Sequence, residues 1–310
     1  MPTWVCRTKP AAPSGPPQEL HQLYVLEGFL ARLAASSERD RFVLKGGVLL
    51  AAFGSRRPTK DIDLAALETA NDVDTVRALV ADVAATVLPE DDGIEFLPET
   101  ARAEAIREDD EYQGVRVHVD ARLATARLPF HVDVNVGDPI WPPPSDVAVP
   151  RLLGGEPITL SGHPIHMVYA EKIVTAVQRG LANTRWRDFG DVWSLSRNHA
   201  VHADDVIRAV DVVARYRKAT LHPLADVLDG FAPLAQARWS RWLRGSGSPH
   251  LPADIAPVLD DAVAFADPVL TRQAAGLAWD PAESVWHELG SLTPALMRAA
   301  SSTSRTNVAF

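Results

Sequence analysis

Two aspartates separated by one residue, Asp61 and Asp63, are the side chains of this sequence best suited to chemistry. They lie in a stretch, Arg57 to Leu67, in which charged and apolar residues alternate, so we expect a strand that presents both carboxylates on one face. Carboxylate oxygens are the ligands that Mg²⁺ prefers, and such a pair could hold one or two ions. A lone Asp-x-Asp pattern is common on solvated strands and does not by itself indicate catalysis.

A pair of glycines, Gly46 and Gly47, precedes the aspartates by thirteen intervening residues. Glycine lets a ligand approach the backbone closely, and the amides at a helix start bind phosphate. The next segment, Val48 to Phe53, reads as a short helix. This order predicts a combined phosphate and metal site. The metal-binding alternative, a calcium loop, needs further oxygen ligands and a turn glycine, which the apolar residues after Asp63 do not supply.

A third carboxylate should lie on a neighbouring strand and face the same way. Asp133 is the first candidate, because it falls on the polar face of the alternating segment Phe130 to Val136. Asp120, at the end of the alternating segment Val115 to Asp120, is the second candidate. The structural alternative for both is the exposed polar face of an edge hairpin.

A second group of charged residues lies between Glu171 and Arg197. Lys172 and Arg179 are seven residues apart, so they share one face of a predicted helix. The start of the next predicted helix carries Arg185, Arg187, Asp188 and Asp191. Surface salt bridges between two helices are the structural alternative for this group.

Taken together, these motifs resemble those of the AbiEii/AbiGii nucleotidyltransferase toxin family. The glycine pair followed by Asp61-Ile62-Asp63 is similar to the signature of the DNA polymerase beta-like nucleotidyltransferase superfamily. The narrower resemblance rests on Arg57-Pro58-Thr59-Lys60-Asp61-Ile62-Asp63-Leu64, Ala170-Glu171-Lys172, Arg179, and Arg185-Trp186-Arg187-Asp188 with Asp191. It covers about residues 40 to 200. The family includes toxins that block protein synthesis by adding nucleotides to the acceptor end of transfer RNA.

The resemblance implies a role for each matching residue. Asp61 and Asp63 would bind Mg²⁺ in what is expected to be a two-metal site, for which Asp133, with Asp120 as the alternative, is the candidate third ligand. Lys172 would bind the triphosphate of the nucleotide substrate and Asp188 would be an essential acid, so the catalytic set is Asp61, Asp63, Lys172 and Asp188. The expected nucleotide-binding set is Gly46, Gly47, Arg57, Thr59, Lys172, Arg179 and Asp191. Thr59 matches a hydroxyl position that in this family can be phosphorylated or contact phosphate.

A basic segment from Asp205 to Gly245 is the candidate acceptor site. Its cations are Arg208, Arg215, Arg217, Lys218, Arg238, Arg241 and Arg244. Trp239 and Trp242 are interleaved among them, and such a pattern could hold an RNA backbone and stack an unpaired base. The structural alternative is a solvated helix whose tryptophans pack inward.

The expected function is therefore a toxin of a toxin–antitoxin system. It would transfer nucleotides from a nucleoside triphosphate to RNA, at the 3′ end of transfer RNA, with a cognate antitoxin as partner. Within enzymes, an aminoglycoside-type nucleotidyltransferase shares the first motif, but the residues from Lys172 to Asp191 favour the toxin. From another class, a catalytically silent binding module would have no need of Asp61 and Asp63 as metal ligands.

Apolar periodicity predicts the elements that must position these residues. Leucines recur at three- and four-residue spacing from Gln18 to Ala35, which predicts an amphipathic helix, and Val73 to Val87 repeats the pattern. The stretch from Ile94 to Gly137 is rich in strands, and a short segment containing Pro129 links two of them in a predicted antiparallel hairpin. We expect an α+β core with a mixed or antiparallel sheet flanked by helices.

The proline-rich stretch from Trp141 to Pro150 changes the composition abruptly, and we place a domain boundary there. Helical patterns follow at 167–182, 186–198, 203–218 and 221–243, and Ala253 to Ala300 also reads as helical. The expected organisation is a flexible arm at residues 1–17, a nucleotidyltransferase core at 18–150 and a mainly helical C-terminal domain at 151–310.

The composition sets limits on partners and compartment. The net charge of -9 argues against a generally basic surface, so any nucleic acid must meet a local patch. Cys6 is the only cysteine, which excludes an intrachain disulfide and a thiolate metal cluster. The sequence shows no apolar run typical of a signal peptide or a membrane span, so we expect a cytoplasmic protein without a membrane partner.

Overall fold

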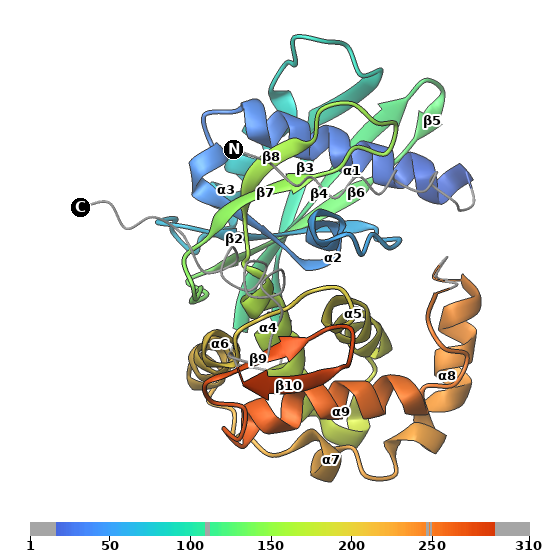
Figure 1. Cartoon of the computed structure of the whole chain (residues 1–310). Coiled ribbons are helices and arrows are strands. Elements are labelled where there is room, and N and C mark those ends of the chain that lie inside the picture. Colours follow the sequence, from blue (N-terminus) through green and yellow to red (C-terminus); the bar gives the residue numbers. More distant parts are fainter. Residues whose placement is uncertain (1–16, 109–111, 246–247, 249, 289–310) are drawn as a thin grey trace, which may run out of the picture.

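The computed structural model describes residues 17–108, 112–245, 248 and 250–288 (Figure 1). The predicted flexible arm at residues 1–17 lies outside the described residues except for its last member, which begins the first helix. The end of the predicted C-terminal helical stretch, from residue 289 on, also lies outside them.

The N-terminal half contains the sheet, with helices beside it. Its helices are α1 (Pro17–Ala35), α2 (Gly46–Leu49) and α3 (Val73–Ala85), with short 3-10 turns at Arg39–Arg41 and Leu50–Phe53. Its first strands are β1 (Phe42–Lys45), β2 (Asp61–Ala66), β3 (Ile94–Glu108) and β4 (Tyr112–Leu123). The others are β5 (Ala126–Arg127), β6 (Phe130–Val136), β7 (Ser145–Val149) and β8 (Ile158–Gly162). The helix predicted at 18–35 and the hairpin of β4 and β6 are confirmed.

Two boundaries differ from the sequence-based expectation. The strand predicted from Arg57 begins only at Asp61, because Pro58 has no amide hydrogen to donate to a sheet and Arg57 turns its side chain toward another element. The sheet also continues past Pro150, since β8 pairs in parallel with β1 through Leu44 and Gly162.

The mixed sheet follows the order β3-β4-β6-β2-β1-β8-β7, with β5 paired to β4. Two pairs of neighbouring strands are parallel, β2 with β6 and β1 with β8. The other neighbouring strands of this sheet are antiparallel. The central sheet is therefore mostly antiparallel, and the α+β class expected from the sequence is confirmed. The candidate aspartates lie on β2 and β6, which are adjacent near its centre.

One face of the sheet is apolar and is covered by α1 and α3 (Figure 1). Phe29 of α1, Phe96 of β3 and Phe130 of β6 pack edge to face there, with ring centroids 5.4 to 6.2 Å apart. Because side chains alternate along a strand, burial of this face forces the intervening polar residues of β2 and β6 onto the other face.

The C-terminal half is mainly helical. Its helices are α4 (Ile165–Arg179), α5 (Trp186–Ser196), α6 (Ala203–Tyr216), α7 (Leu224–Val227), α8 (Phe231–Gly245) and α9 (Ala256–Leu270). The helix predicted at 221–243 is wrong in its extent, because Gly230, at a φ of +75°, separates α7 from α8. The continuous helical stretch predicted from Ala253 is also wrong, because an antiparallel hairpin of β9 (Leu277–Asp280) and β10 (Val285–Glu288) follows α9.

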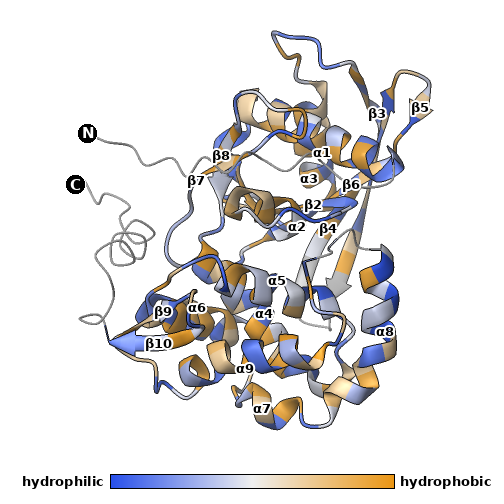
Figure 2. Cartoon of the chain, turned by 45° about the vertical axis from the view of Figure 1, so that its right-hand side comes forward, coloured by the Kyte–Doolittle hydropathy of each residue, from blue (hydrophilic) through white to orange (hydrophobic). Residues whose placement is uncertain are grey.

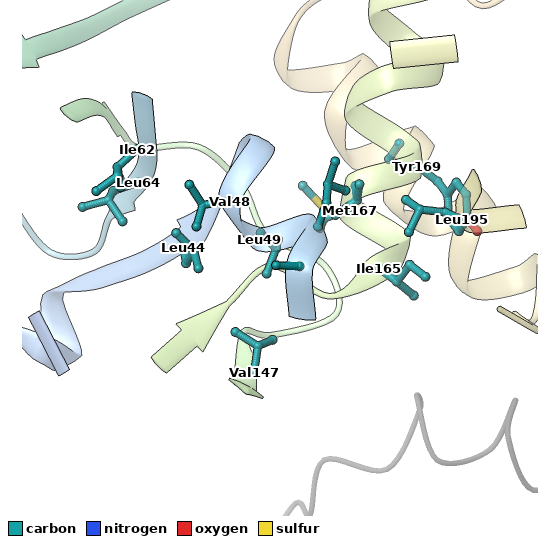
Figure 3. Packing of buried hydrophobic residues seen from close by; sticks show 14 of the residues in the cluster. Leu44, Val48, Leu49, Ile62, Leu64, Val147, Ile165, Met167, Tyr169 and Leu195 are labelled. Carbon is teal, nitrogen blue, oxygen red and sulfur yellow. The ribbon is translucent and has the colours of Figure 1, made fainter. Parts of the chain in front are cut away.

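The apolar core is continuous between the two halves. Figure 3 shows Leu49 of α2 between Leu44 of β1 and the α4 residues Met167 and Ile165, and all four are buried. A single cluster of buried residues runs from Val25 in α1 to Trp279 in β9. A separate C-terminal helical domain is therefore not confirmed, and the division at residue 150 stays a prediction. Among the described helices, none combines the length and hydropathy needed to cross a membrane.

The ion pair between Arg32 of α1 and Asp92 fixes the first helix to the start of β3. Two hydrogen bonds of 2.6 and 3.0 Å join the guanidinium to the carboxylate. Burial would raise the pKa of Asp92, but the hydrogen bonds from Arg32 and from the Ile94 amide lower it. The carboxylate therefore stabilises the fold above the ordinary aspartate pKa of about 3.9, and this contribution is lost as the pH falls further.

Replacing Asp92 with asparagine is expected to lower the free energy of unfolding by about 1–3 kcal/mol at neutral pH, since Arg32 loses its charged partner. The difference from the unmodified protein should narrow as the pH falls below about 4. Urea unfolding at several pH values measures both effects. Asp74→Asn, at a carboxylate that is 87% exposed, is the control and should change little. An Asp92→Asn deficit that is the same at acidic and neutral pH would contradict this account.

Candidate active site

A row of four charged side chains crosses the polar face of the sheet. Strand register places Lys45 of β1 beside Asp63 of β2, Asp63 beside Asp133 of β6, and Asp133 beside Arg116 of β4. The charges alternate as one cation, two carboxylates and one cation. Arg116 holds Asp133 by two hydrogen bonds of 2.8 and 2.7 Å. The two inner carboxylates therefore repel each other, and only the outer positions of the row relieve the repulsion.

The repulsion is visible in the acidity of Asp63. Burial and, after it, the nearby carboxylates Asp61 and Asp133 together raise its pKa to about 6, and Lys45 opposes them. Gly46 fits tightly over this carboxylate, because a Cβ at position 46 would lie 1.8 Å from Asp63 Oδ2. The sequence predicted that a glycine here would let a ligand approach the backbone closely. In the structure, the group that lies close to the Gly46 backbone is the Asp63 carboxylate.

A second row offers ligands for a metal ion. Asp61 pairs in register with His131, and one ligand atom from each of Asp61, His131 and Asp133 lies within 4.8 Å of the others. Burial lowers the pKa of His131, which keeps its imidazole neutral and able to donate a lone pair. Thr59 Oγ1 donates a hydrogen bond of 2.5 Å to Asp61 Oδ1 and so fixes the carboxylate. This donor set fits a divalent cation, with Asp63 next to it on β2.

The structure distinguishes the two candidates for the third carboxylate. Asp133 lies beside Asp63 and lines the same pocket. Asp120, farther along β4, is bound by Arg127 at 2.5 Å, and its backbone amide donates a hydrogen bond of 3.0 Å to the hydroxyl of Thr100. Asp120 does not line the pocket. The position of Asp133 therefore supports it as the third ligand.

The helices supply a buried cation opposite the aspartates. Lys172 of α4 donates hydrogen bonds of 2.9 Å to Asp188 and 2.7 Å to Asp191, both on α5. Burial lowers the pKa of Lys172, but the two carboxylates outweigh burial and raise it, so the ammonium stays charged. Arg57, in the loop before β2, binds Asp191 through two hydrogen bonds of 2.9 and 3.2 Å. Asp191 thus holds both cations in place.

A second buried network adjoins the charged row. Lys45 Nζ lies 3.0 Å from Asp138 and 3.1 Å from Glu171 of α4. Burial would raise the pKa of Glu171, but Lys45 and other neighbouring cations lower it to about 2. Lys45 therefore links the sheet to α4, and it does so within the same pocket wall as Asp63.

Most of these groups line one pocket of about 450 Å³, a volume typical of small-molecule sites. Seven cations line it: Lys45, Arg57, Arg116, Lys172, Arg185, Arg187 and Arg217. Five carboxylates line it: Asp61, Asp63, Asp133, Glu171 and Asp188. The acidic groups of β2 and β6 form one wall, and the cations of α4, α5 and the loop before β2 form another. The pocket can therefore hold an anion next to a divalent cation.

Most of the residues predicted from the sequence meet in this pocket. Lining it are Gly46, Gly47, Arg57, Thr59, Asp61, Asp63, Asp133, Lys172 and Asp188. Arg179 ends α4 and does not line the pocket, so its nucleotide-binding role stays a prediction without support from its position. Asp191 is also absent from the lining and contacts the pocket through Arg57 and Lys172.

The predicted site set left out other polar residues of the lining, among them Lys45, Arg116, Asn135 and Glu171. Two of them are adjacent to predicted residues in the sequence, Lys45 before Gly46 and Glu171 before Lys172. Asn135 lies on the predicted polar face of β6. Arg116 could have been found only from strand register, which sequence alternation does not determine between distant strands.

Of the two interpretations of the α8 tryptophans, the structure supports inward packing for Trp239. Its side chain is fully buried and donates a hydrogen bond of 3.0 Å to the carbonyl of Pro252. Trp242 is half-buried and packs on Trp239, with ring centroids 5.0 Å apart. These rings anchor α8 to α5, because both lie within 4 Å of where a Cβ on Gly190 would be.

Replacing Gly46 with alanine tests whether Asp63 belongs to the cation site. The φ of +66° should cost about 1–2 kcal/mol of stability, and the new methyl group must displace the Asp63 carboxylate. Gly54→Ala is a matched control, because Gly54 has a φ of +72° and open space around it. We expect similar backbone costs in urea unfolding, but weakened Mn²⁺ binding by calorimetry only for Gly46→Ala. Equal Mn²⁺ affinity in the two variants would remove Asp63 from the site.

Comparison with known proteins agrees with this geometry. The family described as “Nucleotidyl transferase AbiEii toxin, Type IV TA system” matches residues 28–264. No curated protein matches the chain significantly. A candidate nucleotidyltransferase from H. pylori is 12% identical, with 72% of this chain and 95% of that chain covered and a TM-score of 0.34.

A second solved structure, JHP933 from Helicobacter pylori, is also 12% identical, with 74% of this chain and 98% of that chain covered and a TM-score of 0.35. Likenesses at these TM-scores carry no weight for fold or activity. The family match stands on its own, because it spans most of the sequence, from α1 to α9, and includes every residue of the pocket. The chain belongs to the AbiEii nucleotidyltransferase toxin family of Type IV toxin–antitoxin systems.

Proposed function

We propose that this chain transfers nucleotides from a nucleoside triphosphate to the 3′ end of RNA, with transfer RNA as the acceptor, and that the transfer depends on Mg²⁺. The observation that carries the proposal is the pocket in which Asp61, Asp63 and Asp133 face the buried cation Lys172. In the reaction, a hydroxyl oxygen of the acceptor forms a bond to the α-phosphorus, and the bond from that phosphorus to the leaving pyrophosphate breaks.

Asp61, Asp63 and Asp133 are the residues that would hold Mg²⁺, with His131 beside them. When bound, the ion would neutralise phosphate charge and polarise the attacking hydroxyl. The protein's own contribution is to align the carboxylates. Thr59 orients Asp61, Arg116 orients Asp133, and Lys45 limits the rise in the pKa of Asp63.

Phosphate binding is assigned to the opposite wall. Lys172 can approach the triphosphate as a point charge, and Arg57 lies in the same network. Gly47 leaves space beside Thr59, since a Cβ at position 47 would lie 2.9 Å from Thr59 Oγ1. Asp188 and Asp191 keep Lys172 charged and positioned while the phosphates are absent.

Two alternative functions differ in what they require of this pocket. An aminoglycoside-type enzyme would use the same metal and phosphate groups on a small hydroxyl compound. Family membership favours the toxin reaction, and it supports a cognate antitoxin as a partner. A silent binding module would retain the fold without needing carboxylates arranged for a cation.

Labelled nucleoside triphosphates, supplied with Mg²⁺ and either total RNA or small hydroxyl compounds, test the proposal. We expect label on RNA, with loss of transfer and of growth inhibition for Asp61→Ala and loss of transfer for Asp133→Asn. Asp120→Asn is the matched control and should retain transfer, because Asp120 lies outside the pocket. Label found only on small compounds would contradict the proposal that RNA is the acceptor. Toxicity that survives Asp61→Ala in a folded protein would favour the binding module.

Lys172→Ala is expected to lower kcat/KM for the nucleotide about 10- to 100-fold, as the loss of a hydrogen bond to a charged group predicts. Arg179→Ala removes a cation from the same helix, about 10 Å along its axis at 1.5 Å per residue, and should have little effect. Steady-state kinetics with varied nucleotide concentration separates the two variants. An equal loss in both would show that the bound nucleotide reaches the end of α4.

A further inference from the structure

The exposed side of α8 carries three arginines and no acidic residue. Arg238, Arg241 and Arg244 are all exposed and recur at three-residue spacing, so they share one side of the helix. They span about 9 Å along the helix axis at 1.5 Å per residue. The chain as a whole has a net charge of -9, so this side of α8 is a positively charged patch on an acidic protein.

These charges continue from the pocket. Arg187, at the first turn of α5, is exposed and lines the pocket. Its neighbour Trp186 stacks on Phe231 of α8, with ring planes 14° apart, and Arg238 lies over the same indole at 5.7 Å. In the described part of the chain, Arg187, Arg241 and Arg244 form no ion pair with a carboxylate. Figures 1 and 2 both show α8 at the edge of the helical half.

We propose that Arg187, Arg238, Arg241 and Arg244 form a track that binds the phosphate backbone of the acceptor RNA and directs its 3′ end into the pocket. The inference rests on the proposed function, in which the acceptor is RNA. Cations spaced along one helix side match a polyphosphate chain. A protein partner would instead favour exposed aromatic anchors, and the tryptophans of α8 face inward.

The second basic helix of the segment, α6, provides a matched comparison. Arg208 and Arg215 are exposed like Arg241 and Arg244, and neither forms an ion pair in the described part of the chain. The α8 group adjoins the start of α5, where Arg238 lies over Trp186 and Arg187 lines the pocket, whereas Arg208 of α6 lies over Trp141. The sequence alone gives no reason to prefer the arginines of α8 over those of α6 as an RNA site. Their positions in the structure favour α8.

The experiment compares Arg241→Glu/Arg244→Glu with Arg208→Glu/Arg215→Glu, which change the net charge equally. Arg238 is left in place because it packs on Trp186. Binding of a purified transfer RNA pool is measured without nucleotide across a salt series. The α8 variant should lose at least about tenfold in affinity, and its slope of log affinity against log salt should fall by about one to two. The α6 variant should match the unmodified protein.

Transfer is measured separately, on transfer RNA and on a trinucleotide too short to reach α8. We expect the α8 variant to raise KM for transfer RNA while leaving KM for the nucleotide and transfer to the trinucleotide unchanged. Equal RNA affinity in the α8 variant and the unmodified protein, or no RNA binding by either, would overturn the track. So would loss of a protein partner without loss of RNA. Transfer only to small compounds would instead overturn the proposed function.

Discussion

The repulsion between Asp63 and Asp133 is the constraint on which the rest of this site depends. Parallel pairing of β2 with β6 places the two carboxylates side by side, and burial makes the repulsion costly. The fold answers it with a cation at each end of the row, Lys45 and Arg116. With Asp61 also on β2, three carboxylates lie beside these two cations, so the compensation on this wall is incomplete. Such a surface binds an added divalent cation favourably, which is the property that a nucleotidyltransferase requires.

On the opposite wall of the pocket, the fold must stabilise a buried cation instead of neighbouring carboxylates. A buried lysine would ordinarily lose its proton, yet Asp188 and Asp191 hold Lys172 in its charged form. Asp191 also binds Arg57, whose loop leads directly into β2. The helical half and the strand with the metal ligands are thus connected through one carboxylate. Removing Asp191 would affect both walls, although Asp191 itself does not line the pocket. This is why its sequence motif belongs with the site.

The sequence predicted the parts of the site that follow from local pattern. Alternation around Asp61 and Asp133 determines the face of each strand, and helical spacing places Lys172 opposite the apolar stripe of α4. Strand order and register come from contacts between distant segments, so the pairing of Arg116 with Asp133 could not be read from the sequence. Gly230 and the β9–β10 hairpin were missed for another reason. Short turns and four-residue strands leave too little periodicity to distinguish them from helix.

The distribution of charge connects the site to its surroundings. An acidic protein repels nucleic acid at long range, so an RNA acceptor needs a local field that is stronger than the average one. Inside the pocket, cations are matched closely by carboxylates, and their charge serves position more than attraction. On α8 the arginines face solvent, while Trp239 and Trp242 are used to fix the helix against α5. Attraction and positioning are therefore carried by different residues, which allows RNA affinity to change without altering the geometry of the reacting groups.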